Sequence, residues 1–344
     1  MSPAAEAHAT AGQSSPGSTA ASVATAPVGG APEGQAAKVT LALDWTPNTN
    51  HTGIYVAQQK GWYEEEGIEL QILPYAEGTT TDQLVSSGTA DFGISFEESV
   101  VLARAAGQDV VSVAAVIQSN TSALVTLKES GLDRPRKLDG KRYAGYGAPF
   151  EEPVISSVIR HDGGKGEFKS VTANLYAYEA VKAGQADFVW IFMGWDGVAA
   201  ERAGVDLNAF YIKDYGVPDY YTPVIITSGE QIEQDPEVVR RFMAATARGY
   251  EWAIANPEEA ADLLIEAAPE GTFPDPELVR ASQQWLSPRY KEGQERWGVQ
   301  DLTVWTEYPR FMYESGKVTD AEGKAVEQEP EYEVYFTNDF LPGE

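Results

Sequence analysis

Alternating apolar and small residues predict short strands in the first half of the chain. Val39 to Leu43 alternates in this way and ends at Asp44, and residues 68–73 repeat the pattern after a helix predicted over residues 54–60. Strand, helix and strand in this order form a βαβ unit, whose ligands commonly lie at the carboxyl ends of the strands. We therefore expect an α/β fold with a ligand site at strand ends.

A ten-residue segment occurs twice in similar form. Residues 84–93 and 180–189 each place a predicted short helix before a glycine, Gly88 or Gly184, and each continue with Ala-Asp-Phe. Glycine readily adopts the left-handed conformation that ends a helix, so a strand should begin near each Ala-Asp-Phe. The repeat favours two α/β lobes of similar architecture, although junctions of this kind are common between helices and strands.

Three helices are predicted in the C-terminal third by one shared signal. Pro236, Pro257 and Pro276 each follow Asp or Asn and precede Glu. A capping side chain thus stands before a proline suited to the first helical turn, and a carboxylate lies near the positive helix end. In the first of these helices apolar residues recur at spacings of four and three, which predicts one face packed on a core.

Two segments are candidates for passages between the lobes. Residues 125–127 lead from an apolar stretch into a polar one, and residues 223–227 lead back into the helical section. If both are hinge strands, lobe 1 consists of residues 38–127 plus 224–344 and lobe 2 of residues 128–223. A chain that crosses twice encloses a cleft whose closure can hold a ligand.

Composition excludes several classes of function. The 344 residues include 25 Lys+Arg against 52 Asp+Glu, a formal net charge of −27, which disfavours nucleic acid and anionic membrane surfaces as partners. The chain has no cysteine, which excludes disulfides, thiolate metal sites and cysteine nucleophiles. Its longest nearly apolar stretch, Val110 to Ile117, is much shorter than the ~20 residues that a membrane helix needs.

The first 37 residues are dominated by Ala, Gly, Ser, Thr and Pro. Such a segment buries too little apolar surface to offset its conformational entropy, so we expect residues 1–37 to form a disordered tether. The composition is typical of a low-complexity terminus and equally of the spacer of a surface-anchored protein.

Catalytic and metal-binding signatures do not occur in the sequence. The three histidines, His8, His51 and His161, lie far apart and form no His-Glu-x-x-His motif. The chain also lacks a nucleophile elbow, a phosphate-binding loop and a complete dinucleotide fingerprint. We expect no metal, no cofactor and no catalytic residue, although a carboxylate pair would not stand out among so many acidic residues.

Aromatic and polar residues remain at the predicted strand ends. Flat apolar faces with a few carboxylates suit a planar ligand with exocyclic amino groups, because rings stack on its faces and carboxylates accept its N–H groups. Each candidate also has a structural alternative: a core position for an aromatic residue, a helix cap for a carboxylate, and hydrogen bonds within its own loop for the histidine. The candidate ligand-binding residues are Trp45, Asn48, His51, Phe96, Glu97, Tyr146, Pro149, Glu151, Trp190, Trp195, Asp196 and Tyr221.

The run Trp-Thr-Pro-Asn-Thr-Asn-His at residues 45–51 closely resembles the start of periplasmic-type binding proteins that collect thiamine pyrimidine precursors for ABC importers. The same superfamily includes the fungal pyrimidine synthases of thiamine biosynthesis. The resemblance covers about residues 38–290 and continues through residues 88–93, 138–141, 184–187 and 235–242. The first run is specific, whereas the Gly-x-Ala-Asp and Leu-x-Gly-Lys signatures occur widely among related sulfonate, nitrate and pyrimidine binders.

The resemblance implies a two-lobe periplasmic binding protein fold of type II, with two crossings and a formylated or hydroxymethylated aminopyrimidine in the cleft between the lobes. It implies stacking by Trp45 or Tyr146 on one ring face and by Trp195 on the other. Asp196 would accept a hydrogen bond from the 4-amino group. The resemblance further implies an ABC permease as partner and an extracytoplasmic or cell-surface location behind a removed lipoprotein signal.

Related binders of riboflavin and of alkanesulfonates are the nearer alternatives. A sulfonate site normally recruits Arg or helix N-termini, whereas the candidate loops offer carboxylates. Riboflavin remains an alternative ligand because it is also a flat heterocycle. The synthases are a more distant alternative, since the resemblance gives them a histidine and a cysteine-rich iron-binding segment; this chain has His51 in a comparable loop but no cysteine.

Overall fold

Two five-stranded sheets organise the chain in the computed structural model, which describes residues 36–76, 78–145, 147–173 and 177–343. The strands are β1 (Ala37–Ala42), β2 (Ile68–Leu73), β3 (Phe92–Ser95), β4 (Val111–Ala115), β5 (Ser122–Leu127), β6 (Arg142–Ala144), β7 (Lys169–Ser170), β8 (Phe188–Phe192), β9 (Leu207–Tyr211) and β10 (Val224–Thr227). The first sheet has the order β2-β1-β3-β10-β4 and the second the order β7-β6-β8-β5-β9. The fold is therefore α/β, as predicted.

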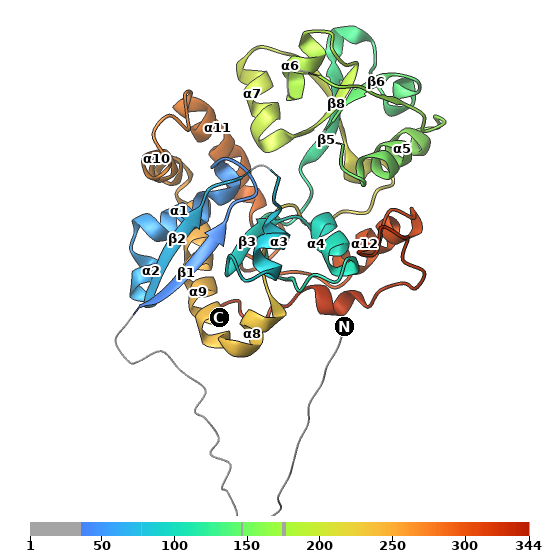
Figure 1. Cartoon of the computed structure of the whole chain (residues 1–344). Coiled ribbons are helices and arrows are strands. Elements are labelled where there is room, and N and C mark those ends of the chain that lie inside the picture. Colours follow the sequence, from blue (N-terminus) through green and yellow to red (C-terminus); the bar gives the residue numbers. More distant parts are fainter. Residues whose placement is uncertain (1–35, 77, 146, 174–176, 344) are drawn as a thin grey trace, which may run out of the picture. The chain divides into compact units, whose positions relative to one another are not determined.

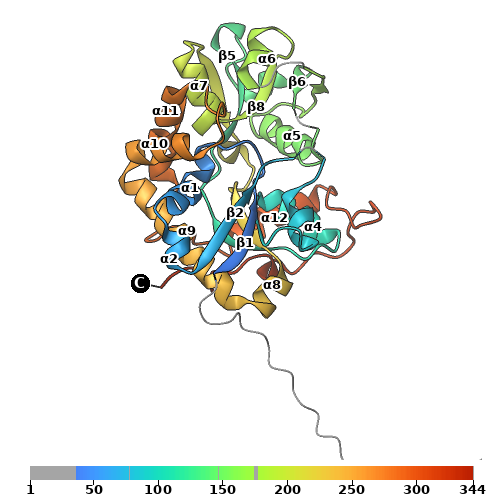
Figure 2. The ribbon, with the colours of Figure 1, turned by 60° about the vertical axis from the view of Figure 1, so that its left-hand side comes forward.

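Helices cover both sheets. Figures 1 and 2 show α1, α2 and α9 on one side of the first sheet and α4 and α12 on the other, and Figure 1 shows α5, α6 and α7 around the second. The α-helices are α1 (Thr52–Gln59), α2 (Trp62–Glu65), α3 (Thr81–Ser86), α4 (Glu97–Ala105), α5 (Glu151–His161), α6 (Ala177–Lys182), α7 (Val198–Arg202), α8 (Gly229–Gln234), α9 (Pro236–Ala255), α10 (Pro257–Ala267), α11 (Pro276–Leu286) and α12 (Val304–Glu314). The shorter turns are η1 (Thr49–His51), η2 (Lys128–Ser130), η3 (Pro135–Leu138), the π-helical η4 (Met193–Gly197), η5 (Ile212–Tyr215), η6 (Ser287–Arg289) and η7 (Tyr332–Tyr335).

The two sheets repeat one architecture, which confirms the prediction made from the repeated segment. In each sheet three parallel strands are followed by an antiparallel one, β10 in the first sheet and β5 in the second. The repeated aspartates have equivalent partners: Asp91 Oδ2 accepts a hydrogen bond from Thr40 N at 2.7 Å, and Asp187 Oδ2 accepts one from Arg142 N at 2.9 Å. Each aspartate thus ties the second strand in the order of its sheet, β1 or β6, to the third, β3 or β8.

The chain passes between the sheets earlier than the sequence suggested. We assigned residues 122–127 to the first lobe, but β5 pairs with β8 and β9 and so belongs to the second sheet. The first passage therefore lies between Ala115 and Ser122, and the second between Tyr211 and Val224. The change from apolar to polar residues after residue 127 marks the end of a buried strand of the second sheet.

Helices α9, α10 and α11 begin at the three predicted prolines. The predicted caps are only partly present. Asp275 accepts hydrogen bonds from the amides of residues 277 and 278, whereas the side chains of Asp235 and Asn256 form no capping bond. Asn256 instead donates to Trp252 O at 2.9 Å, so that its side chain binds the last turn of the preceding helix.

Helix α9 packs against α1 at a point where two glycines meet. An added Cβ on Gly249 would lie 1.9 Å from Gly53 O, and one on Gly53 would lie 2.3 Å from the Tyr250 ring. The close approach buries Phe242 and Ala245 on the same helix, as its apolar spacing predicted, while Trp252 stays half-buried. Any larger residue at position 249 must push the two helices apart.

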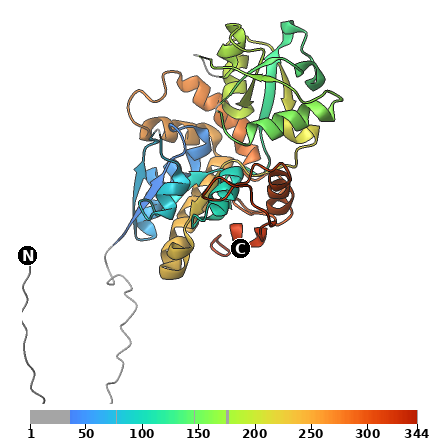
Figure 3. The same ribbon diagram turned by 45° about the vertical axis from the view of Figure 1, so that its right-hand side comes forward.

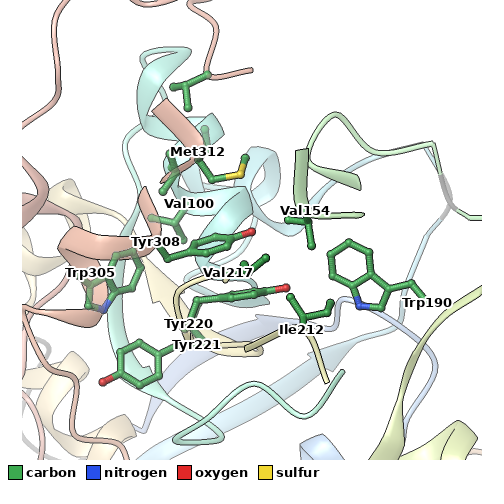
Figure 4. Packing of buried hydrophobic residues seen from close by; sticks show 14 of the residues in the cluster. Val100, Val154, Trp190, Ile212, Val217, Tyr220, Tyr221, Trp305, Tyr308 and Met312 are labelled. Atoms are coloured by element: carbon green, nitrogen blue, oxygen red, sulfur yellow. The ribbon is translucent and has the colours of Figure 1, made fainter. Parts of the chain in front are cut away.

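A single hydrophobic cluster joins side chains from elements of both sheets. Val100 and Met312 come from α4 and α12, whereas Val154 and Trp190 come from α5 and β8. Figure 4 shows these side chains around the rings of Tyr220 and Tyr308, whose centroids are 3.8 Å apart in a stacked arrangement. All of them lie within one compact unit, residues 36–344.

Residues 1–35 of the predicted tether lie outside the described residues. In the described part of the chain, no helix combines the length and apolar character needed to cross a membrane.

Candidate functional site

The loop after β1 holds its polar residues in internal hydrogen bonds. Asn48 caps η1 by accepting from Asn50 N at 2.9 Å. His51 is fully buried; its Nδ1 accepts from Asn48 N at 3.3 Å, so the ring proton resides on Nε2 and is donated to Asp44 Oδ1 at 2.8 Å. Both ring nitrogens are therefore used inside the loop, which favours a structural role for His51.

Trp45, in the same loop, is 48% exposed and lies 4.8 Å from the Tyr75 ring between centroids. It is one of the few large apolar side chains with such exposure, and its indole face is accessible to a ligand. Phe96 is half-buried at the N-terminus of α4.

Glu97 and Tyr221 are brought together at the start of α4. Tyr221 N donates to Glu97 Oε2 at 2.8 Å, and Glu97 N donates to Tyr221 O at 3.1 Å. Tyr221 Oη accepts from Asp301 N at 2.9 Å. Burial raises the pKa of Glu97 well above its ordinary value, and the charges of Glu98 and Asp219 raise it further, against the hydrogen bond from Tyr221 N. The pair fixes the second passage between the sheets.

The loop between β6 and α5 contains the candidates Tyr146 and Pro149, and the candidate Glu151 begins α5. Glu151 Oε2 accepts from Gly147 N at 3.0 Å, and Pro149 is exposed. Trp190 is 6% exposed and meets the Phe150 ring edge-on, with centroids 6.0 Å apart. Tyr146 lies outside the described residues.

Trp195 and Asp196 lie on the π-helical turn η4, directly after β8. The indole of Trp195 is half-buried and lies 6.3 Å from the Phe273 ring. Asp196 Oδ2 accepts from Phe192 N at 3.3 Å, and burial raises the pKa of this carboxyl to about 6, with a smaller contribution from Glu179. Ser282 of α11 donates to Gly194 O, and Figure 3 shows the orange helices α10 and α11 beside the yellow-green α7 that follows η4.

A small cavity of about 20 Å³ lies where both passages between the sheets meet this turn. Thr121 and Thr222 come from the two passages, and Trp195 comes from the turn η4 that follows β8 of the second sheet. None of its lining residues carries an ionisable side chain. The residues that line it are Asn50, Ile117, Thr121, Phe192, Gly194, Trp195, Thr222 and Leu286.

The structure thus brings one of the twelve candidates, Trp195, to the cavity wall, with Asp196 next to it in the chain. Our sequence reasoning missed Thr121 and Thr222 as lining residues. The available signal was their position, because both stand in the passages between the sheets, which border the cleft in a two-lobe protein.

A larger depression, of about 510 Å³, lies away from all twelve candidates. Its walls include Lys128, Glu129, Lys182 and Asp206, which are charged. Because neither passage between the sheets contributes a residue to its walls, the small cavity is the better candidate site. Within the described residues, no group of three or more His, Cys, Asp or Glu is placed to hold a metal ion.

Solved structures define the class of the fold. A putative periplasmic sulfonate-binding protein of an ABC transporter from Methylobacillus flagellatus aligns with a TM-score of 0.64 at 18% identity, over 89% of this chain and 93% of that one. A Candida albicans protein, described as having the generic periplasmic binding protein fold, aligns with a TM-score of 0.58 at 14% identity, over 90% and 98%. The chain has the periplasmic binding protein fold, as predicted.

Sequence comparison then gives the family. Residues 48–260 match the family described as NMT1/THI5 like, and the chain belongs to it. The formylaminopyrimidine-binding protein of Halalkalibacterium halodurans is 32% identical over 274 residues, which are 78% of this chain and 82% of that protein. The 4-amino-5-hydroxymethyl-2-methylpyrimidine phosphate synthase of Legionella pneumophila is 32% identical over 237 residues, which are 68% of this chain and 74% of that protein. The riboflavin-binding protein RibY of Chloroflexus aurantiacus is 29% identical over 315 residues, which are 89% of this chain and 86% of that protein.

Proposed function

We propose that this protein is an extracytoplasmic solute-binding protein that captures a thiamine-related aminopyrimidine and delivers it to an ABC permease. The fold and the name of the Halalkalibacterium relative support a binding role for a formylated or hydroxymethylated aminopyrimidine. The observation that carries the choice of solute is the chemistry of the cavity wall, which combines aromatic, apolar and neutral polar side chains.

The uncharged wall favours a neutral heterocycle over an alkanesulfonate. A buried sulfonate needs an arginine, a lysine or several converging N–H groups, because an unpaired charge is costly to bury. The cavity offers instead an indole at Trp195, a phenyl ring at Phe192 and the hydroxyls of Thr121 and Thr222. Rings stack on the first two, and hydroxyls exchange hydrogen bonds with ring nitrogens and exocyclic amino groups.

Solute entry requires a change in the cavity. A volume of about 20 Å³ has room for about one water molecule, far less than a pyrimidine needs. Its walls come from both passages and from segments that follow strands of both sheets, so a rotation at the two passages would enlarge it, and a bound solute would bridge the sheets. Asp196, whose carboxylate now accepts from Phe192 N, would then turn to the 4-amino group of the solute. A closed, loaded form would dock on the permease.

The same proposal assigns no catalysis to this chain, although the Legionella relative is named a synthase. The absence of cysteine from the sequence supports this part of the proposal, together with the structural use of both ring nitrogens of His51. Formation of a pyrimidine by purified protein with iron and pyridoxal phosphate would contradict it. We further propose that the protein works outside the cytoplasmic membrane, anchored by a lipid.

Isothermal titration calorimetry with four solutes, two aminopyrimidines, taurine and riboflavin, tests the proposal. We expect heat and saturation with 4-amino-5-hydroxymethyl-2-methylpyrimidine and its formylaminopyrimidine analogue, and none with taurine. A Trp195→Ala variant serves as the site control and should bind more weakly. Heat with taurine alone would overturn the assignment, and heat with riboflavin alone would support the riboflavin alternative suggested by RibY.

A further inference from the structure

The hydroxyl of Thr222 has no hydrogen-bond partner among the residues that the structure describes, although Thr222 is only 1% exposed. Other buried threonines of this chain pair their hydroxyls: Thr81 donates to Ile94 O at 2.6 Å, and Thr246 donates to Phe242 O at 2.7 Å. An unpaired buried hydroxyl destabilises a fold. Among the described residues other buried side-chain atoms also lack a partner, including those of Asn120 and Trp190, but of these residues Thr222 alone lines the small cavity.

The backbone on both sides of Thr222 is held firmly. Tyr221 exchanges two hydrogen bonds with Glu97, one through its N–H and one through its carbonyl. On the other side, Val116 N donates to Pro223 O at 3.0 Å, which joins the second passage between the sheets to the first. These bonds hold the backbone on both sides of Thr222 in the free protein.

Thr222 lines the small cavity opposite side chains of the other sheet. Phe192 and Trp195 provide its aromatic walls, and Thr121 provides a second hydroxyl-bearing side chain from the other passage. A side chain that can donate and accept a hydrogen bond thus lies beside surfaces on which a flat ring can stack.

We propose that the Thr222 hydroxyl hydrogen-bonds the polar edge of the bound solute and selects for planar, uncharged nitrogen heterocycles. This inference rests on the proposed function, because it assigns a specificity residue to the same cavity. A threonine hydroxyl can donate to a ring nitrogen and accept from an adjacent amino group, whereas an aliphatic chain offers it neither. The energy lost by leaving the hydroxyl unpaired in the free protein is recovered when the solute binds.

Paired substitutions separate this role from a structural one. Thr222→Val keeps the shape of the side chain and removes the hydroxyl, Thr222→Ser keeps the hydroxyl, and Thr246→Val is the matched control with a paired hydroxyl far along α9. Each variant is titrated with 4-amino-5-hydroxymethyl-2-methylpyrimidine and melted without ligand. Thr222→Val should weaken binding about five- to tenfold while its melting temperature stays equal or rises, because it removes an unpaired group.

Thr222→Ser should bind within about twofold of the wild type. Thr246→Val should melt at a lower temperature and bind normally. If the wild type binds the aminopyrimidine and Thr222→Val binds it with the same affinity, this inference is overturned and the proposed function stays intact. A lower melting temperature of Thr222→Val would also overturn it, because the hydroxyl would then be paired within the fold. A wild type that binds no aminopyrimidine would overturn both.

Discussion

Replacing Glu98 with glutamine should remove a large pH dependence from the stability of this fold. Glu98 is 3% exposed in α4, and its Oε2 has no hydrogen-bond partner among the described residues. Burial raises the pKa of this carboxyl from 4.5 to about 8, and the charge of nearby Asp82 adds to the effect, against a backbone hydrogen bond that lowers it. The folded protein therefore keeps this carboxyl protonated at neutral pH.

The sign and size of the effect follow from proton linkage. In the unfolded chain the Glu98 carboxyl loses its proton near pH 4.5, whereas in the folded chain it loses it near pH 8. The folded state thus binds more protons between these values, so the contribution of Glu98 to stability is fully present below about pH 4.5 and is lost as the pH rises through about 8. The pKa values of Glu98 in the folded and unfolded chain differ by 8 − 4.5, or about 3.5. At about 1.36 kcal/mol per pKa unit, this difference changes the free energy of unfolding by roughly 5 kcal/mol at most.

Urea unfolding followed by tryptophan fluorescence measures the effect between about pH 5 and about pH 8.5. Glu98→Gln is nearly isosteric with the protonated acid, so it should match the wild type near pH 5 and exceed its free energy of unfolding by several kcal/mol near pH 8.5. The control is Glu152→Gln, which changes an exposed carboxylate paired with Lys317 at 2.7 Å. Parallel pH profiles for Glu98→Gln and the wild type would refute the buried, protonated state of this carboxyl.

Two further predictions concern packing and ligand contact. Gly249→Ala should lower the free energy of unfolding by several kcal/mol, because the new Cβ would lie 1.9 Å from Gly53 O; a thermal melt that matches the wild type would contradict the close helix contact. Trp195→Ala and Asp196→Ala should each weaken aminopyrimidine binding by about 1–3 kcal/mol, through lost stacking area and a lost charge-assisted hydrogen bond. Calorimetry checks both, and unchanged dissociation constants would remove the two residues from the site.

Local signals in the sequence predicted the elements of this fold well. The glycine that ends a helix and the Ala-Asp-Phe that follows occur at Gly88 and Gly184, which both adopt the left-handed conformation, with φ of 70° and 69°. These signals depend on residues a few positions apart, so they can be read without the rest of the chain. The sheet of β5 could not be predicted in this way, because its partners β8 and β9 lie more than sixty residues further along the chain.

The site was predicted less completely, because its chemistry depends on which partners each side chain meets. The sequence suggested His51 and Glu97 as ligand residues. In the structure both side chains are buried and form hydrogen bonds within the protein, so they support the fold. The sequence signals Thr222 only through its place in a passage between the sheets, since a hydroxyl without a partner can be recognised only when its surroundings are known. Trp195 was predicted from its place after a strand, and that position does bring it to the cavity.

The most direct test is a crystal structure of the protein with 4-amino-5-hydroxymethyl-2-methylpyrimidine. The account predicts the ring between elements of the two sheets, stacked on Trp195 and within hydrogen-bond distance of the Thr222 hydroxyl. Ligand density in the charged depression beside Lys128 and Lys182, with the small cavity unchanged, would contradict it.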